Sequence, residues 1–158
     1  MLVKDIMTIE VVSFRADDSL ASAAKTFIDK KISAGPVVDE EGNVVGIISE
    51  TDLMKVVEYH TGLGTEILSL IPWVGTQVAL QRDFKEMDKL LHKIREARVK
   101  DRMTTEAFTV HPEDEVSRAA EAMMLRKVNH IPVVDAEGKL IGIVARADII
   151  RAIVIEGV

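Results

Sequence analysis

The chain of 158 residues contains one segment twice. Residues 3–53, the first copy, align without a gap with residues 99–149, the second copy, and 19 of the 51 aligned positions are identical. The shared elements are VKD-MT, PVVD and the pairs Gly46/Gly142, Ile47/Ile143 and Asp52/Asp148. Repeats of this kind usually exist because one unit cannot bury its apolar face alone. We therefore expect two halves of one body with equivalent clefts between them.

Composition narrows the class of protein. Hydrophobic residues make up 47% of the chain, charged residues 29%, and the formal net charge is -6, which is typical of a globular protein with an acidic surface. The absence of cysteine excludes disulfides and thiolate chemistry. The apolar stretch Ile67–Val74 is far shorter than the roughly 20 residues of a membrane span, and the first residues do not resemble a signal peptide. We expect a cytoplasmic protein with no membrane span and no nucleic-acid partner.

The first half of each copy predicts a short strand and a helix. A β-prone run, 11–14 or 107–110, precedes a turn with acids suited to capping a helix, Asp17-Asp18 or Glu113-Asp114. Apolar residues then recur at helical spacing and predict a buried helix face. These residues are Leu20, Ala23, Ala24, Phe27 and Ile28 in the first copy, and Val116, Ala119, Ala120, Met123 and Met124 in the second.

The second half of each copy predicts a hairpin followed by another helix. PVVD and VVGII, or PVVD and LIGIV, are short apolar runs separated by a turn that contains Gly42 or Gly138, as in a hairpin of buried strands. A helix then begins near Glu50 or Arg146. Each copy is therefore predicted to be a β-α-β-β-α unit, and the chain to be an α+β protein.

Residues 58–98 have no counterpart in the repeat. Ile67–Val74 includes Trp73 and forms an apolar patch, and residues 77–99 have the pattern of an amphipathic helix, with Phe84, Met87, Leu91 and Ile94 on one face. Two roles stay open for this insert. It connects the copies and lies against their core, or it offers a surface to a partner or a second copy of the chain.

The start of the second helix carries the candidate chemistry. Ser49, Thr51 and Asp52 lie at a helix N-terminus, where free backbone N–H groups and the helix dipole favour phosphate. The Asp52 carboxylate repels phosphate but suits the two hydroxyls of a ribose. This combination indicates a nucleotide. The alternative is a capping box, in which Ser49 and Asp52 only satisfy the helix end.

The second copy helps to weigh these readings. Ser49 corresponds to Ala145 and Thr51 to Ala147, yet the acid persists as Asp148. A reciprocal capping box is impossible there, so the persistence of the acid favours a ligand role, although an acid in the first turn of a helix is also stabilised by the dipole.

Several catalytic classes lack their motifs. His60, His92, His111 and His130 show no metal-ligand spacing, and no Walker loop, GxGxxG motif or Ser-His-Asp pattern is present. We expect a protein that is not an enzyme, has no metal site and requires no cofactor.

The doubled unit, with its PVVD hairpin and G-h-h-[S/T]-x-[S/T]-D signature, resembles the cystathionine-beta-synthase (CBS) domain, and the pair resembles a Bateman module. The resemblance covers residues 1–57 and 97–156. It implies two pseudo-twofold related β-α-β-β-α units packed through their sheets: a first unit at 1–57, a largely helical insert at 58–98 and a second unit at 99–158. Such modules are regulatory, bind AMP, ADP, ATP or sometimes S-adenosylmethionine in two clefts, and often form homodimers.

The resemblance also implies site residues, with each cleft taking its base-binding side from one copy and its ribose and phosphate side from the other. The first cleft would use Asp52 for ribose, Ser49 and Thr51 near phosphate, and Thr104, Thr109, Val128, Asn129 and His130 around the base. The second would use Asp148 for ribose, Thr8, Ser13, Ile32, Ser33 and Ala34 around the base, and Asn129, His130 and Arg146 toward phosphate.

The chain departs from the family pattern at one place. Some members have His-Arg before the PVVD-type strand, where the first copy has Ser33-Ala34, so the first cleft lacks an obvious cation. We therefore favour the second cleft for phosphate-rich ligands, and a cleft with few phosphate contacts suits a nucleoside-like ligand.

Two functions follow as hypotheses. The first is a sensor in which an adenosine ligand, an adenine nucleotide or S-adenosylmethionine, shifts the packing of the two copies and changes what an effector protein meets. The second is a ligand-free scaffold that acts through the insert.

Overall fold

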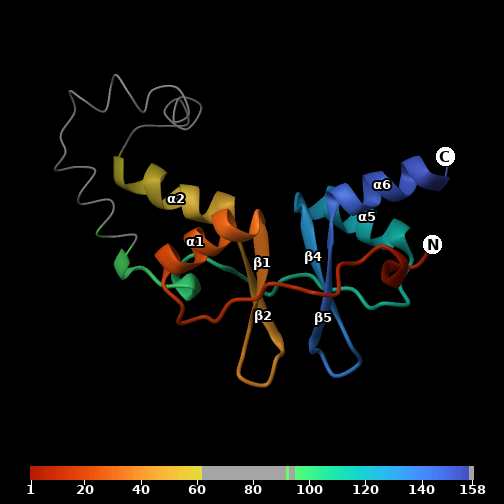
Figure 1. Ribbon diagram of the computed structural model, residues 1–158, viewed down its shortest axis with the longest axis horizontal. Coiled ribbons are helices and arrows are strands. Elements are labelled where there is room, and N and C mark those ends of the chain that lie inside the picture. The colour runs from red at the N-terminus through yellow and green to blue at the C-terminus, as the bar shows by residue number, and fades with distance from the viewer. Residues whose placement is uncertain (62–91, 93–94, 157–158) are drawn as a thin grey trace. The chain divides into compact units, whose positions relative to one another are not determined.

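The computed structural model describes residues 1–61, 92 and 95–156, which form two compact units. The larger unit contains 1–16, 34–48 and 103–156, and the smaller unit contains 17–33, 49–61, 92 and 95–102. The α+β prediction is confirmed, because each copy contributes a hairpin and two helices (Figure 1). In chain order the elements are η1 Val3–Asp5, α1 Leu20–Lys30, β1 Ala34–Val38, β2 Val44–Ser49, α2 Glu50–Thr61, η2 Val99–Asp101, β3 Thr104–Thr105, α5 Val116–Arg126, β4 His130–Val134, β5 Leu140–Ala145 and α6 Arg146–Glu156.

The two predicted hairpins form as expected. β1 neighbours β2, with β3 on the far side of β2, and β4 pairs antiparallel with β5 from His130↔Ala145 onward. In the first hairpin turn, Asp39 Oδ1 accepts the N–H groups of Glu41 at 3.0 Å and Asn43 at 2.9 Å. The hydrogen bonds from Asn43 lower the pKa of the Asp39 carboxyl. Gly42 follows at φ 86°, a left-handed conformation that glycine adopts without strain.

The predicted strands at 11–14 and 107–110 are wrong, because each segment makes only a single parallel bridge, Phe14↔Val37 or Val110↔Val133. Phe14 donates its N–H to the carbonyl of Pro36 and accepts the N–H of Val38, both at 2.9 Å. The next parallel bond toward the N-terminus would need an N–H on Pro36, which proline lacks. Pro132 has the same effect on the second segment.

The N-terminal segment of the first copy packs on the second copy. Val3 donates its N–H to the Asp114 carbonyl at 2.8 Å, and its fully buried side chain belongs to the core of the larger unit. That core consists of Val3, Val110, Ala119, Ala122, Met123, Ile131, Val133, Val144 and Ile149. In the smaller unit, Val99 in turn donates its N–H to the Asp18 carbonyl at 2.9 Å. The two copies have therefore exchanged their VKD segments.

Both first helices form where predicted, with two corrections. Ser19 caps α1 by accepting the N–H of Ser22 at 3.1 Å, whereas we had assigned this role to Asp17-Asp18. Ile28 and Met124 were predicted to be in the core, yet they are 76% and 77% exposed, because they lie at the margin of the apolar face. Leu20, Ala23 and Phe27 of α1 are buried as expected.

The insert lies mostly outside the described residues. This applies to the apolar patch at 67–74 and to Phe84, Met87, Leu91 and Ile94 of the predicted amphipathic helix. The helix was expected to continue to Val99, but residues 97–99 are not α-helical: Arg98 is extended and Val99 begins η2. The Val99 side chain is fully buried, so the C-terminal end of the insert takes part in the packing of the smaller unit.

An exposed ion pair connects Lys100 of η2 with Asp17 in the turn before α1. Lys100 Nζ lies 2.6 Å from Asp17 Oδ1. The hydrogen bond and charge of Lys100 lower the pKa of Asp17, and Asp17 raises the pKa of Lys100. The stabilisation is present above the unfolded pKa of aspartate and lost as pH falls through the lowered folded value. It is likewise present below the unfolded pKa of lysine and lost as pH rises through the raised one.

Replacing Lys100 with methionine should therefore lower Tm slightly at pH 7, since exposed pairs contribute little. The Tm difference should vanish well below pH 3.9, about the ordinary pKa of aspartate, where Asp17 is protonated. Thermal melts of both proteins at the two pH values test this. A difference that persists in acid would assign the effect to the lysine stem rather than to the ion pair.

Candidate ligand-binding site

Asp52 lies in the first turn of α2 and forms the reciprocal capping box that the sequence allowed. Its Oδ2 accepts the N–H and the hydroxyl of Ser49, both at 2.9 Å, and its own N–H donates to Ser49 Oγ at 3.4 Å. Its Oδ1 lies 3.5 Å from Lys55 Nζ. Asp52 is only 6% exposed. Its carboxylate is therefore mostly shielded from water, and the contacts with Ser49 and Lys55 offset the cost of burying it.

Asp148 occupies the equivalent place in α6 without a serine. Its Oδ2 accepts the N–H of Ala145 at 2.8 Å, and its Oδ1 accepts Arg151 Nη1 at 3.2 Å. Because the donor is a backbone N–H, the acid stabilises this helix start whatever side chain stands at 145. The presence of an aspartate in both copies thus has a structural cause, and it does not by itself indicate a ligand role for Asp148.

Lys55 and Arg151 are neighbours of the acids that sequence reasoning missed. They occupy equivalent positions in the two copies, three residues after each aspartate. Residues three apart on a helix lie on the same face, so this spacing was the available signal.

The first N–H groups of both helices are not free for an anion, contrary to our expectation. Glu50 donates its N–H to the Ser33 carbonyl at 2.9 Å, and Arg146 donates to the Asn129 carbonyl at 2.8 Å. The N–H groups of Ser49 and Ala145 go to the aspartates. A bound phosphate would therefore depend on N–H groups further along and on side chains.

Four of the predicted site residues meet at one end of the larger unit. His130 begins β4 and pairs with Ala145, the last residue of β5. Asn129 precedes His130, and its carbonyl accepts the N–H of Arg146. Arg146 is exposed and is the first residue of α6, and Asp148 lies two residues further along the same helix. We call Asn129, His130, Arg146 and Asp148 the Asp148 cluster. It combines a carboxylate that accepts hydrogen bonds with side chains able to donate them.

The predicted base-binding residues Thr8 and Ser13 lie on a segment that crosses from one hairpin to the other. Thr8 exchanges backbone hydrogen bonds with Ile143 of β5, at 2.9 and 3.0 Å, and Phe14 then pairs with β1. The second copy repeats this crossing. Thr104 pairs with Ile47 of β2, and Val110, next to Thr109, pairs with Val133 of β4.

The remaining predicted residues fall into two groups. Ala34 is buried at the start of β1, and Val128 packs against the core of the larger unit. Ile32, Ser33, Ser49, Thr51 and Asp52 belong to the smaller unit. Within that unit the Ser33 carbonyl and the Asp52 carboxylate meet at the start of α2.

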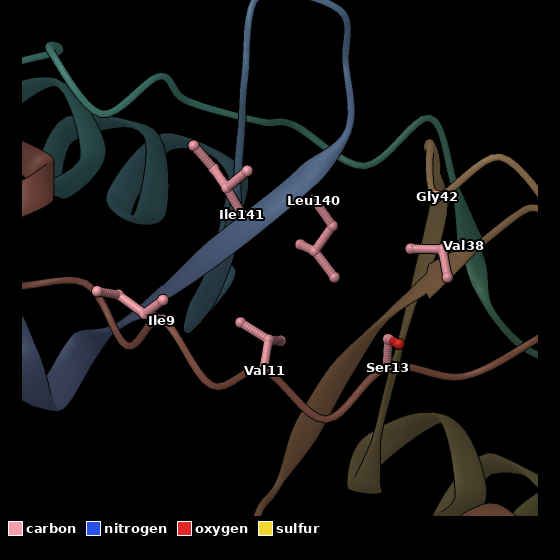
Figure 2. A pocket seen from close by; sticks show the side chains of 7 residues that line it. All are labelled: Ile9, Val11, Ser13, Val38, Gly42, Leu140 and Ile141. Carbon is pink, nitrogen blue, oxygen red and sulfur yellow. The ribbon is translucent and has the colours of Figure 1, made fainter.

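A shallow cavity of about 250 Å³ lies beside the crossing segment in the larger unit. In Figure 2, Val11 and Ser13 lie on that segment and Leu140 points toward them from β5. The cavity is lined by Ile9, Val11, Ser13, Val38, Gly42, Leu140 and Ile141. Most of its lining residues are apolar, and of the predicted site residues it contains Ser13 alone. It is smaller than the usual pocket for a drug-sized ligand.

The residues that the structure describes contain no group of three or more His, Cys, Asp or Glu side chains placed to hold a metal ion. None of their helices is long and apolar enough to cross a membrane.

The model of the CBS domain family matches residues 3–59 and 99–155, which together make up most of the chain. This chain belongs to the CBS domain family. The two matches correspond to the two copies of the repeat, so the resemblance inferred from the sequence is confirmed.

Among similar proteins, the uncharacterized protein MJ1426 of Methanocaldococcus jannaschii is 34% identical over 155 residues, covering 98% of this chain and 92% of its own. The solved structure of CBSX2 in complex with AMP is 28% identical, with a TM-score of 0.71 and coverage of 99% and 98%. CBSX2 is a chloroplastic CBS domain protein of Arabidopsis thaliana, and this chain spans 55% of its full length. The CBS domain pair of protein MJ0100, in complex with 5-methylthioadenosine and S-adenosyl-L-methionine, is 26% identical, with a TM-score of 0.71 and coverage of 96% and 98%.

Proposed function

We propose that this CBS pair is a regulatory module that binds an adenosine-containing ligand, AMP, ADP or ATP, with the ribose held by Asp148. The observation that carries this proposal is the Asp148 cluster. It places a fixed carboxylate in the first turn of α6, two residues after an exposed arginine, and the start of α6 adjoins the histidine that begins β4, in a chain whose structural relative CBSX2 is seen with AMP. A carboxylate accepts the hydrogen bonds of a ribose diol, and the guanidinium of Arg146 suits phosphate.

S-adenosylmethionine is the second candidate. The structure of the MJ0100 CBS pair with this ligand and 5-methylthioadenosine favours it. Both ligands carry the ribose diol without phosphate, so they would engage Asp148 without a phosphate contact at Arg146.

The test is calorimetric titration of the purified protein with AMP, ADP, ATP, S-adenosylmethionine and 5-methylthioadenosine. We expect micromolar binding of at least one adenine nucleotide. Tighter binding of S-adenosylmethionine than of every nucleotide would move the assignment to the second candidate. No binding by any of the five, with folded and ligand-free protein, would overturn the proposal.

Regulation requires that the ligand change what the module presents to an effector protein. A ligand can shift a conformational equilibrium only by its difference in affinity for the two states. The proposal therefore requires that the ligand bind one arrangement of the module more tightly than another.

We propose that the module is a homodimer joined through α5 and α6, which contact each other in the larger unit. An apolar face remains exposed on them, and faces of this kind usually mark an association site. On α6, Ile150, Ile153 and Val154 have the spacing of one helix face. The exposed side chains are Met124, Leu125, Ile150, Ile153, Val154 and Ile155.

Replacing Ile153 with aspartate should convert the dimer to a monomer, because a charge would be buried in an apolar interface. The expected change is about 100-fold or more in the dimer dissociation constant, measured by sedimentation equilibrium. Lys30→Gln, at an exposed position of α1, lowers the net charge by the same one unit and controls for that change. A wild-type protein that is monomeric at high concentration would contradict the dimer.

A further inference from the structure

The shallow cavity beside the crossing segment lies apart from the Asp148 cluster. Its lining from the two hairpins comes from the turn ends of the strands, at Val38, Leu140 and Ile141. The aspartate contact lies at the other end of β5, where Ala145 bonds to Asp148. Ile141 and Ala145 are separated by four steps along β5, which is about 13 Å in a strand. The cavity is therefore a feature separate from the proposed ribose site.

The fold does not require an apolar lining at this place. The other copy has Thr105 and Ala107 at the positions of Ile9 and Val11, and its segment crosses between the hairpins in the same way. Ile9 is 72% exposed and lies outside the core of the larger unit. Most of the other residues along the cavity wall are apolar as well. A contiguous apolar surface of this kind marks an association site.

The size of the cavity suits one large side chain. Its volume of about 250 Å³ is below the about 300–1,000 Å³ of pockets for drug-sized ligands. Protein interfaces, in contrast, are commonly anchored by a single aromatic or aliphatic side chain that fills a pocket. The cavity is also open to an incoming chain at one turn, because a Cβ at Gly42 would meet no atom within 4 Å.

The hairpin turns give the cavity an acidic rim. A backbone bridge joins the two turns, residues 39–43 and 135–139. Together they carry five acidic residues and one lysine, a net charge of -4, in a chain whose total is -6. The lysine is already engaged, since Lys139 Nζ donates to the Glu41 carbonyl. Glu10 adds an exposed acid on the crossing segment. A basic segment is the electrostatic complement of this surface.

We propose that this cavity is a docking site for a basic peptide segment of a partner protein, which inserts one large apolar side chain between Val11 and Leu140 (Figure 2) and places lysine or arginine beside the hairpin turns. The apolar side chain gains free energy by leaving water, and the flanking cations are attracted by the acidic turns. The docking site is separate from the Asp148 cluster, so it goes beyond the proposed function and does not depend on it.

Fluorescence polarisation with the full chain and labelled synthetic peptides tests this site. One peptide has a central tryptophan between arginines, a second has the tryptophan between glutamates, and a third has a central alanine between arginines. We expect the first to bind, the other two to bind at least tenfold more weakly, and added salt to weaken the first. Equal binding of the first two peptides would overturn the basic partner, and no binding of the first would overturn the site.

Two pairs of variants locate the bound peptide. Val11→Asp should weaken binding tenfold or more, although it adds a negative charge, because it places a carboxylate in the apolar cavity. Ala107→Asp makes the same charge change at the equivalent position of the other copy and should keep the wild-type affinity. Ile9→Ala should weaken binding roughly fivefold through lost apolar contact, and Thr105→Ala should leave it unchanged. Equal effects within either pair would overturn the location.

Circular dichroism shows whether each variant is folded. If Val11→Asp is not, the pair Ile9→Ala and Thr105→Ala decides, because both side chains are exposed. A second copy of the chain is the other possible occupant of the cavity. In that case Ile9→Ala would raise the dimer dissociation constant in sedimentation equilibrium, and this result would overturn the proposal.

Discussion

Replacing Ile131 with alanine is expected to lower the free energy of unfolding by about 2–5 kcal/mol. Ile131 lies in β4, pairs with Val144 of β5 and has no exposed surface. It belongs to the same core as Val3, which the first copy supplies to the second. Truncation removes apolar contacts and leaves a cavity that the surrounding strands fill only in part. Urea unfolding followed by circular dichroism measures the loss.

Ile9→Ala provides the comparison for this prediction. Ile9 is 72% exposed, so its truncation should change the free energy of unfolding by no more than about 0.5 kcal/mol. Equal losses for the two variants would mean that Ile131 does not lie in a packed core. That result would contradict the arrangement of β4 and β5 described above.

Replacing Asp148 with asparagine is expected to lower the affinity for AMP about 100-fold or more. Two ribose hydroxyls bound to a carboxylate make two charge-assisted hydrogen bonds, each of about 1.5–3 kcal/mol. The amide keeps one acceptor oxygen, and Ala145 N–H and Arg151 already compete for it. Its NH₂ group points a donor at the donors of the ribose. Calorimetric titration with AMP measures the change.

Asp135→Asn is the control for this substitution. Asp135 is also an aspartate of the second copy, and its Oδ1 accepts the N–H groups of Glu137 and Lys139 in the hairpin turn. This variant makes the same chemical change away from the Asp148 cluster, so AMP affinity should stay at the wild-type value. Loss of affinity in both variants would point to a general effect on the fold. Full affinity in Asp148→Asn would remove Asp148 from the site.

The hairpins and helices were predictable because their signals are local. Period-3.6 apolar residues, turns at Gly42 and Gly138, and the aspartates at the helix starts each act within a few residues of chain. The predicted strands at 11–14 and 107–110 were wrong, because the length of a strand depends on how many hydrogen bonds the neighbouring strand can make with it. Only the pairing with β1 and β4 reveals that Pro36 and Pro132 remove the next donor.

The exchange of the VKD segments could not be predicted from this sequence. Val3 and Val99 are identical, and both copies offer a similar apolar site, so nothing local tells the chain which copy to use. Burial of Val3 against Val110 and Ile131 is a property of the folded core. The short stretch between Val3 in this core and Phe14, which pairs with β1, then fixes where Thr8 and Ser13 lie.

The sequence indicated candidate residues for the site but not the hydrogen bonds that they make. The sequence indicated Asp52 and Asp148, and the capping box at Ser49 was a stated alternative. The periodicity of the sequence did not indicate the contacts of the two aspartates with Lys55 and Arg151. It also did not indicate that the carbonyls of Ser33 and Asn129 accept the first N–H groups of the two helices. Both depend on the folded geometry. These contacts decide how many hydrogen bonds each aspartate can still accept.

The central claim is that Asp148 holds the ribose diol of an adenosine ligand. The most direct measurement compares the binding of AMP and of its 2′,3′-dideoxy analogue to the wild-type protein and to Asp148→Asn by calorimetry. We predict that the wild type binds AMP about 100-fold or more tightly than the analogue, and that Asp148→Asn loses most of this preference. Equal affinity of the wild type for AMP and the analogue would contradict the claim.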